Sequence, residues 1–259
     1  MESNYDKWAD VYDLVYSYVK DDIGFFVKES KLCSGEILEL GSGTGRITLP
    51  IAIAGCKITG IDFSSKMVAL ATQKASCVLP NSRNLTFLQK DMRDFDLQKK
   101  FSRIFIPFRG FQSLLSVEDQ ASTLKAIKKH LEPDGKLIFS VFVPDILMIA
   151  EGYIPLSHFR DVKDPITGET VSLWHEGQID TYNQIMHIRL SGKSTYKKHK
   201  IIKDFDREFE IRYSFRWEIF HLLNRYGFKV EEIFGDFSSS PYDQDSTEMI
   251  WVAKAPIDC

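Results

Sequence analysis

Residues 36–46, EILELGSGTGR, constrain the fold of this chain more than any other segment. An apolar run of strand length ends at Gly41, and Gly43 and Gly45 follow at alternate positions before a new apolar segment begins. Glycine adopts backbone angles that other residues avoid, and it lets a ligand approach the backbone closely. A glycine turn between a strand and a helix holds such a ligand at the helix N-terminus. The segment therefore predicts a strand–turn–helix unit that binds a small ligand.

Short apolar runs alternate with helical segments from this unit to Pro144. Strands that alternate with helices form a parallel sheet with helices on both faces, so the sequence predicts an α/β fold with a doubly wound sheet. The last two helical segments begin at serines, which suit an N-cap. The expected strands are residues 35–41, 57–63, 84–92, 101–108 and 136–144, and the expected helices are 46–55, 64–75 and 116–131.

The pattern changes after Pro144 and differs again at the N-terminus. Residues 170–215 alternate apolar and polar positions, which predicts an antiparallel hairpin or small sheet with turns at IDTYNQ and SGKS. Residues 5–29 place aromatic and aliphatic side chains at helical spacing and predict one or two helices. The chain is expected to close with a helix at 216–228 and strands at 229–237 and 246–256.

Charge and cysteine content argue against several classes of function. The 33 Lys and Arg residues and 36 Asp and Glu residues give a formal net charge of −3, so no overall positive field favours nucleic acid. The basic run KKHKIIK, residues 197–203, is interpreted as a solvated strand face or loop. The 4 cysteines form no CxxC pair, which argues against a metal site or a disulfide framework.

Targeting signals are also missing from the sequence. The acidic N-terminus has no apolar signal segment, and no apolar run approaches the roughly 20 residues of a membrane span. We therefore expect a cytoplasmic protein with no membrane partner, present as a monomer or a homodimer.

The spacing of glycines and acids defines the ligand further. The dinucleotide motif GxGxxG has its third glycine where this chain has Arg46, and no GK[ST] follows to make a P-loop. Asp62 ends the next expected strand, where a carboxylate accepts hydrogen bonds from a ribose diol. Glu39 and Asp91, in KDM, add acids on neighbouring strands. The predicted ligand therefore contains a ribose and no pyrophosphate.

In order and spacing, ELGSGTG, GIDFSSKM, KDMRDF and HLEPDGKLIF resemble the motifs of class I S-adenosylmethionine-dependent methyltransferases over residues 35–145. The resemblance implies S-adenosyl-L-methionine as the cofactor and a Rossmann-like, mostly parallel seven-stranded sheet with an antiparallel β insertion after strand five. The single methyltransferase domain, 1–259, would comprise an N-terminal helical cap (1–30), a cofactor-binding core (31–145), an inserted β lid (146–215) and a closing helix with the last two strands (216–259).

Carried over position by position, the resemblance implies a set of cofactor contacts. Gly41, Ser42, Gly43 and Gly45 would contact the methionine moiety and the ribose, and Asp62 would bind the ribose hydroxyls. Phe63, Met67 and Met92 would pack against the adenine ring, and Asp91 would accept from its amino group. Phe108 would face the cofactor. Arg46 is a candidate partner for the methionine carboxylate, because a guanidinium suits that group. The alternative for Arg46 is a surface position on the helix.

The end of the fourth expected strand, IPFRGFQSLL, bears on the acceptor. Relatives that methylate bases or glutamine amides carry [DN]PP[YF] here, whereas this chain has Ile106 and Phe108 at the first and third positions. The difference argues against DNA adenine or glutamine methylation. Arg109 follows at the carboxyl end of the strand, where open sheets bind ligands. Two interpretations are open: Arg109 holds an acidic acceptor, or it braces the N-terminal helix.

The N-terminal aromatic residues and the insertion are expected to close a pocket. Tyr12 or Tyr16 is expected to pack over the cofactor or to touch the acceptor, with packing in the core as the alternative. His175 in the insertion and His221 before the sixth strand are candidate general bases, with structural roles as the alternative. Glu248 is a candidate partner for a cationic amine. The cap and insertion loosely resemble those of N-methyltransferases for glycine, amino sugars and peptide N-termini.

The predicted function is transfer of a methyl group to a nitrogen or oxygen of a small-molecule acceptor. Methyl transfer from a sulfonium is an in-line displacement, so positioning supplies much of the acceleration. Two alternatives remain at this stage. One is an RNA or protein methyltransferase, and the other is a non-catalytic S-adenosylmethionine-binding regulator.

Overall fold

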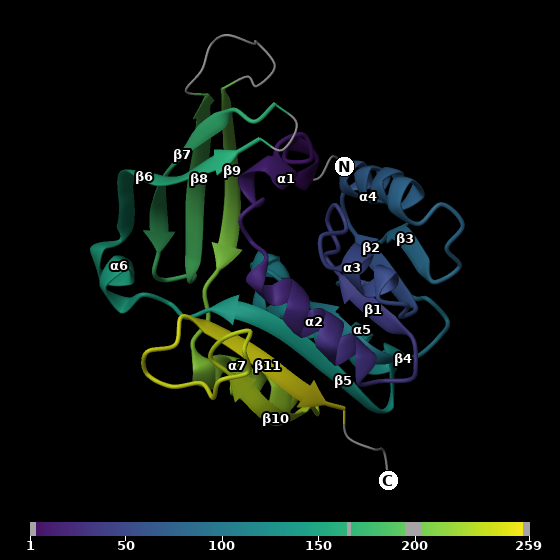
Figure 1. Cartoon of the computed structure of the whole chain (residues 1–259). Coiled ribbons are helices and arrows are strands. Elements are labelled where there is room, and N and C mark those ends of the chain that lie inside the picture. Colours follow the sequence, from purple (N-terminus) through teal and green to yellow (C-terminus); the bar gives the residue numbers. More distant parts are fainter. Residues whose placement is uncertain (1–3, 165–166, 195–203, 256–259) are drawn as a thin grey trace.

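The computed structural model describes residues 4–164, 167–194 and 204–255 (Figure 1). The strands of its larger sheet are β1 (Ile37–Leu40), β2 (Ile58–Asp62), β3 (Leu85–Gln89), β4 (Phe101–Ile106), β5 (Leu131–Phe142), β10 (Lys229–Phe234) and β11 (Glu248–Lys254). Their order is β10-β11-β5-β4-β1-β2-β3. The pairs from β3 to β5 are parallel, and β11 runs antiparallel to β5 and β10. The prediction of a mostly parallel, seven-stranded sheet is confirmed.

Helices cover both faces of this sheet because its central strands are apolar on both sides. In β1, Ile37 joins one core cluster and Leu38 the other. The first cluster includes side chains from α2 (Asp21–Lys31) and α3 (Thr48–Ile53), and the second from α5 (Val117–His130) and α7 (Arg216–Arg225). Helix α4 (Ser65–Val78) lies against β2 and β3. The predicted serine caps are present, at Ser64 for α4 and at Ser116 for α5.

The insertion leaves the main sheet after β5 and returns at α7. It contains α6 (Ile146–Glu151), β6 (Tyr153–Lys163), β7 (Thr170–Asp180), β8 (Ile185–Ser194) and β9 (Phe205–Arg212), and its strands form an antiparallel sheet in that order. In Figure 1 this sheet stands apart from the main sheet, with α1 (Tyr12–Val15) between it and α4.

Two sequence-based expectations for the insertion were wrong. The small sheet begins at Tyr153 instead of residue 170, because β6 is a mostly exposed edge strand with two register irregularities and carries no alternating apolar pattern. The stretch SGKS lies within β8 instead of forming a turn. Its glycine, Gly192, lies against the ring of Phe205, so it permits close packing of two strands. The predicted turn at IDTYNQ is present between β7 and β8.

The N-terminal segment is more broken than predicted. A short 3-10 helix (Asn4–Lys7) and the single-turn α1 precede α2, in place of one or two longer helices. Trp8, Leu14 and Val15 are buried against the inner face of the inserted sheet. The aromatic spacing therefore reflects packing on that sheet as well as helical periodicity. We call residues 4–20 the cap.

The described ranges contain no helix that is long and apolar enough to cross a membrane. The basic run at 197–203 lies outside the described residues.

Candidate active site

The glycine loop between β1 and α3 adopts the geometry that its sequence predicts. Gly41, Gly43 and Gly45 have φ angles of 70°, 53° and 86°, in the left-handed region that favours glycine. The amide of Ser42 donates to the carbonyl oxygen of Ile61 at 3.0 Å, which ties the loop to β2. Two loop residues, Gly41 and Gly43, thereby face the space above the sheet.

Asp62 holds the loop and the end of β2 together. Its Oδ2 accepts from the amide of Gly43 at 2.7 Å, and its Oδ1 accepts from the amide of Ser64 at 2.8 Å. Burial raises the pKa of Asp62, although both backbone donors oppose that rise. Each carboxylate oxygen still has a free lone pair. The carboxylate can therefore accept from a pair of vicinal hydroxyls while it keeps the loop in place.

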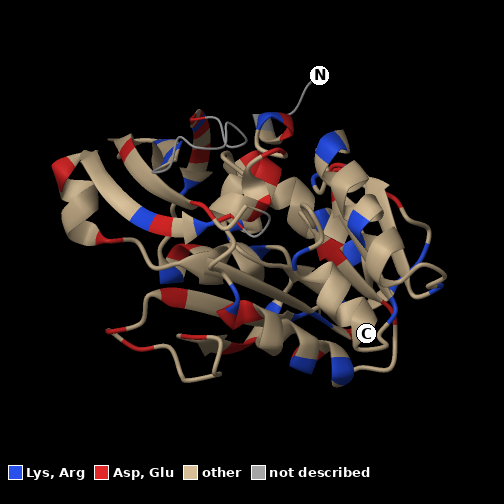
Figure 2. Ribbon diagram, turned by 45° about the horizontal axis from the view of Figure 1, so that its top comes forward, with Lys and Arg blue, Asp and Glu red and all other residues tan. Residues whose placement is uncertain are grey.

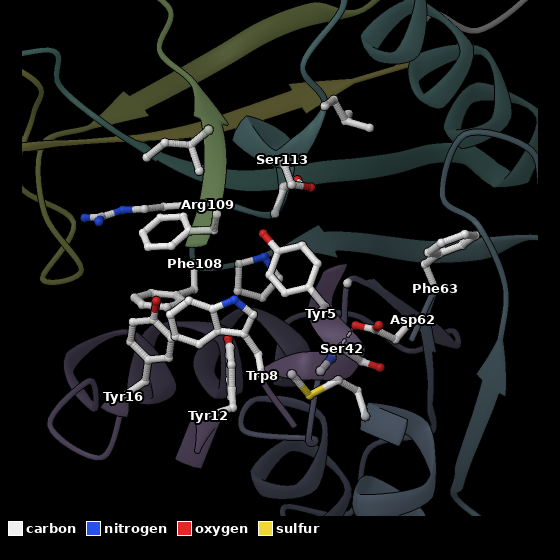
Figure 3. A pocket seen from close by; sticks show the side chains of 18 of the residues that line it. Tyr5, Trp8, Tyr12, Tyr16, Ser42, Asp62, Phe63, Phe108, Arg109 and Ser113 are labelled. Carbon is white, nitrogen blue, oxygen red and sulfur yellow. Dashed lines mark hydrogen bonds between the residues drawn. The ribbon is translucent and has the colours of Figure 1, made fainter. Parts of the chain in front are cut away.

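A cavity of about 670 Å³ lies over the carboxyl ends of the strands and brings the predicted residues together. Figure 3 shows the rings of Tyr5, Trp8, Tyr12 and Tyr16 gathered near Phe108, with Ser42, Asp62 and Phe63 on the other side. Predicted site residues that line the cavity are Tyr12, Tyr16, Gly41, Ser42, Gly43, Arg46, Asp62, Phe63, Met67, Asp91, Met92, Phe108, Arg109 and His175. Gly45 lies behind the loop, where an added Cβ would stand 3.0 Å from Phe87 Cζ.

Two acids at this end of the cavity have distinct environments. Glu39 is buried beneath the loop, which raises its pKa to about 8, and it accepts a short hydrogen bond from Thr48. Asp91 accepts from Arg93, with Nη2 at 2.6 Å from Oδ2, and Arg93 also reaches Asp119 at 3.3 Å. Burial raises the pKa of Asp91, but the hydrogen bonds and the charge of Arg93 together outweigh it, so the pKa of Asp91 lies below its ordinary value. Asp91 is therefore ionised and positioned beside Met92.

Arg46 makes a bidentate ion pair that the sequence did not reveal. Its Nη1 and Nη2 donate to the two carboxylate oxygens of Asp22 at 2.6 and 2.7 Å, and Nη1 also donates to the carbonyl oxygen of Val19. The guanidinium lies 5.0 Å from the ring centre of Phe108. A methionine carboxylate at this place would share Arg46 with Asp22.

Carboxylates of the cap bind the loops of the core. Asp6 accepts from the hydroxyl of Ser64, and Asp13 accepts from the hydroxyl of Thr44 at 2.6 Å. On the other side, Arg207 of β9 pairs with Asp10 at 2.9 Å, and the indole of Trp8 donates to the carbonyl oxygen of Glu208 at 3.3 Å. These contacts could not be predicted, because acids scattered through YDKWADVYD carry no signal of their distant partners.

The other end of the cavity lies beneath the inserted sheet. Tyr16 meets Phe108 edge-on at 4.9 Å, and burial raises the pKa of its hydroxyl. His175, on the inner face of β7, stacks on Phe159 at 5.0 Å, and burial lowers its pKa. His221 and Glu248 are not among the described residues that line the cavity. Tyr18, Phe142 and Phe159 do line it, although no motif in the sequence singles them out.

The sequence of residues 37–135 matches the protein family described as "Methyltransferase domain", and this range contains the glycine loop, Asp62 and Asp91. This match and the fold support a class I S-adenosylmethionine-dependent methyltransferase. YqeM of Bacillus subtilis (strain 168) is 29% identical to this methyltransferase over 254 residues, 96% of each chain. A glycine/sarcosine N-methyltransferase of Halorhodospira halochloris is 26% identical over 96% of this chain and 86% of that protein.

A solved structure has the same fold over the whole of its length. The S-adenosylmethionine-dependent methyltransferase from Clostridium acetobutylicum ATCC 824 superposes with a TM-score of 0.78 and 19% identity, covering 98% of this chain and 100% of that one. The insertion and the cap are therefore within the shared architecture.

The residues of this methyltransferase fit S-adenosylmethionine. The hydroxyl of Ser42 is buried in the loop without a hydrogen-bond partner among the described residues, so it is free for a polar ligand. Asp62 offers acceptors to the ribose, and Phe63 and Met67 line the cavity beside it. Within the described ranges, no group of three or more His, Cys, Asp or Glu side chains could hold a metal ion.

Proposed function

We propose that this methyltransferase transfers a methyl group from S-adenosylmethionine to a nitrogen or oxygen of a small-molecule acceptor bound beneath the inserted sheet. The observation that carries the proposal is the continuity of the cavity, which runs from Gly43 and Asp62 to His175 and Ile211 of the insertion. A cavity that joins a cofactor loop to an apolar chamber suits a small acceptor. The glycine/sarcosine N-methyltransferase among the relatives also acts on a small molecule by its name.

The charge distribution also supports a small-molecule acceptor instead of a nucleic-acid substrate. Figure 2 shows acidic and basic residues interspersed along the ribbon. On the outer face of the inserted sheet, Arg189 pairs with Asp206 and Glu176. A phosphate backbone would meet acids beside these bases, which weakens the electrostatic attraction that such binding needs.

In this proposal the chain acts mainly by positioning. When bound, S-adenosylmethionine supplies an electrophilic methyl group. The aromatic side chains of the cap exclude water from the cavity, and Tyr16, which stays protonated because burial raises its pKa, donates a hydrogen bond toward the acceptor. His175 accepts a proton from the acceptor atom when that atom binds protonated, because its lowered pKa keeps the imidazole neutral at neutral pH.

Ligand binding tests the cofactor assignment directly. Calorimetry should show binding of S-adenosylmethionine and its demethylated product, and no micromolar binding of NAD, because Arg46 stands where a dinucleotide loop has glycine. Asp62→Ala should weaken binding of S-adenosylmethionine by roughly 1.5–3 kcal/mol, or about 10- to 150-fold, because the ribose hydroxyls lose their hydrogen bonds to a charged carboxylate. Absence of heat with either compound in a folded sample would refute the cofactor site, and an unchanged affinity in Asp62→Ala would remove that residue from it.

The pH dependence of methyl transfer tests the role of His175. With an acceptor that binds protonated, the rate should fall as pH drops through the pKa of His175, which lies below its ordinary value of 6.5. His175→Gln should be slower and should lack this fall, while keeping its affinity for the cofactor. The measurement is transfer of a labelled methyl group between pH 5 and 8. The same acid limb in His175→Gln would assign the titration to another group.

A further inference from the structure

The chamber beneath the inserted sheet is strongly apolar. Six of its wall residues, from α6 and the inner face of the sheet, are Met148, Ile154, Met186, Ile188, Phe209 and Ile211. His175 is the one titratable side chain that the insertion contributes to the described lining, and its lowered pKa makes it neutral. The insertion thus offers the acceptor an apolar surface without charge.

The acids that line the cavity lie at its other end. Among the described residues they are Glu39 in β1, Asp62 at the end of β2, Asp91 in the loop after β3 and Asp119 at the start of α5. Each already has a partner, in Thr48, the loop amides or Arg93. An alkylammonium group in the chamber would therefore meet no carboxylate from the described lining.

Glu248 does not supply a carboxylate for an alkylammonium group either. Its Oε1 accepts from Nη2 of Arg109 at 3.0 Å, and Glu248 itself is not among the described lining residues. The predicted role of Glu248 toward a cationic amine thus competes with an ion pair that is already formed.

Of the four cations in the described lining, Arg46, Lys90, Arg93 and Arg109, Arg109 is the one beside Phe142. The guanidinium lies between the rings of Phe108 and Phe142, at 5.6 and 5.2 Å from their centres. Phe108 and Arg109, just after β4, have φ angles of 46° and 66°. This conformation is unfavourable for two consecutive non-glycine residues, and it sets the direction of both side chains. In Figure 3 the side chain extends past Phe108 and away from Asp62, so it belongs to the acceptor end.

The guanidinium has unused donors. Its Nε is buried and has no hydrogen-bond partner among the described residues, and the ion pair with Glu248 engages only Nη2. Its charge also opposes the burial-driven rise in the pKa of both Tyr16 and Tyr18. A buried donor without a partner is costly unless a ligand supplies one. A planar guanidinium with free donors matches a carboxylate.

We infer that the acceptor is an apolar molecule that carries a carboxylate, which Arg109 binds, while its apolar body packs against the inserted sheet. The inference rests on the proposed function, because it names the acceptor class of the same cavity. Glu248 fixes one edge of the guanidinium and leaves the remaining donors to the acceptor. Arg109 is accordingly a determinant of acceptor specificity. The carboxylate anchors the acceptor, whichever of its atoms receives the methyl group.

Three probes with one apolar body and different head groups test this inference. 3-Phenylpropionate, 3-phenylpropanol and 3-phenylpropylamine are titrated into protein saturated with the demethylated cofactor. Compounds of this size bind favourable sites at millimolar concentrations or below. The acid should bind at least about tenfold more tightly than the amine, the scale of a hydrogen bond to a charged group. A preference for the amine, equal binding of acid and amine, or no binding of the acid at millimolar concentrations would overturn the inference.

Variants assign the preference to Arg109. Arg109→Met should reduce the affinity for the acid about tenfold or more and leave the affinity for the alcohol unchanged. Arg109→Lys should retain part of the affinity for the acid. Arg189→Met, on the outer face of the inserted sheet, removes the same charge and should have no effect. An unchanged affinity of Arg109→Met for the acid would contradict the assignment. If Arg109→Met does not fold, the wild-type probe series decides alone.

Binding of the demethylated cofactor separates this inference from the proposed function. If the cofactor product does not bind, the proposed function fails. If it binds and the acid is not preferred, only the acceptor class is wrong.

Discussion

Replacing Arg46 with methionine is expected to lower the free energy of unfolding by about 3–5 kcal/mol, the usual cost of breaking a buried ion pair from one side. The side chain of Asp22 is only 1% exposed, so the variant leaves a buried carboxylate without its bidentate partner. The hydrogen bond to Val19 and the contact with Phe108 are lost as well. Urea unfolding of the two proteins at neutral pH measures the difference.

Two further variants make this prediction specific. Arg46→Met combined with Asp22→Leu removes both charges and should recover much of the lost stability, because replacing a whole buried pair by apolar residues is often neutral. Arg189→Met removes an exposed guanidinium that pairs with Asp206 and should change stability little. If Arg46→Met is no more destabilising than Arg189→Met, the Asp22 pair does not hold the N-terminal region to the glycine loop.

Glu39 is expected to make the protein less stable as pH rises. Its pKa is about 8 in the folded state, against an ordinary value of 4.5, because burial disfavours the carboxylate. Below pH 4.5 both states are protonated. Between pH 4.5 and 8 the unfolded chain releases the proton while the folded chain keeps it, so the free energy of unfolding falls. At 1.36 kcal/mol per pKa unit the total fall is up to about 4–5 kcal/mol.

Glu39→Gln isolates this effect from other titrating groups. Glutamine keeps the size of the side chain and an oxygen that accepts from Thr48, and it does not ionise. Urea unfolding at pH 5 and pH 8 should show that the variant gains stability relative to the wild type at the higher pH. An identical pH dependence in both proteins would show that Glu39 does not titrate in this window.

The central sheet and the cofactor loop could be predicted because their signals are local. Gly41, Gly43 and Asp62 follow apolar runs that can only be buried strands, and the turn geometry follows from glycine itself. The alternation of strands and helices predicts the parallel, doubly wound sheet, and the resemblance to methyltransferases implies its seven strands. The serine caps at Ser64 and Ser116 depend on residues three positions apart, so they were also predictable.

Features that depend on distant partners could not be predicted. Neither alternative for Arg46, a partner of the cofactor or a surface position, includes its ion pair, because nothing in the sequence connects it with Asp22, which is 24 residues away. Strand β6 was missed because an exposed edge strand needs no apolar alternation. Gly192 looked like a turn residue, since only the folded sheet shows Phe205 lying against it. The roles of Tyr16, Arg109 and His175 remain predictions, because position in a cavity does not by itself establish catalysis.

The cap is fastened on both flanks, and this bears on how ligands enter and leave. Asp6 and Asp13 attach it to the core loops, while Asp10 and Trp8 attach it to β9. Because one segment walls both ends of the cavity, displacing it exposes the cofactor end and the acceptor end together. We therefore expect exchange of spent cofactor and release of methylated product to be linked in time. Substitutions at Asp6, Asp10 or Asp13, which are not among the described lining residues, should alter turnover without touching either ligand.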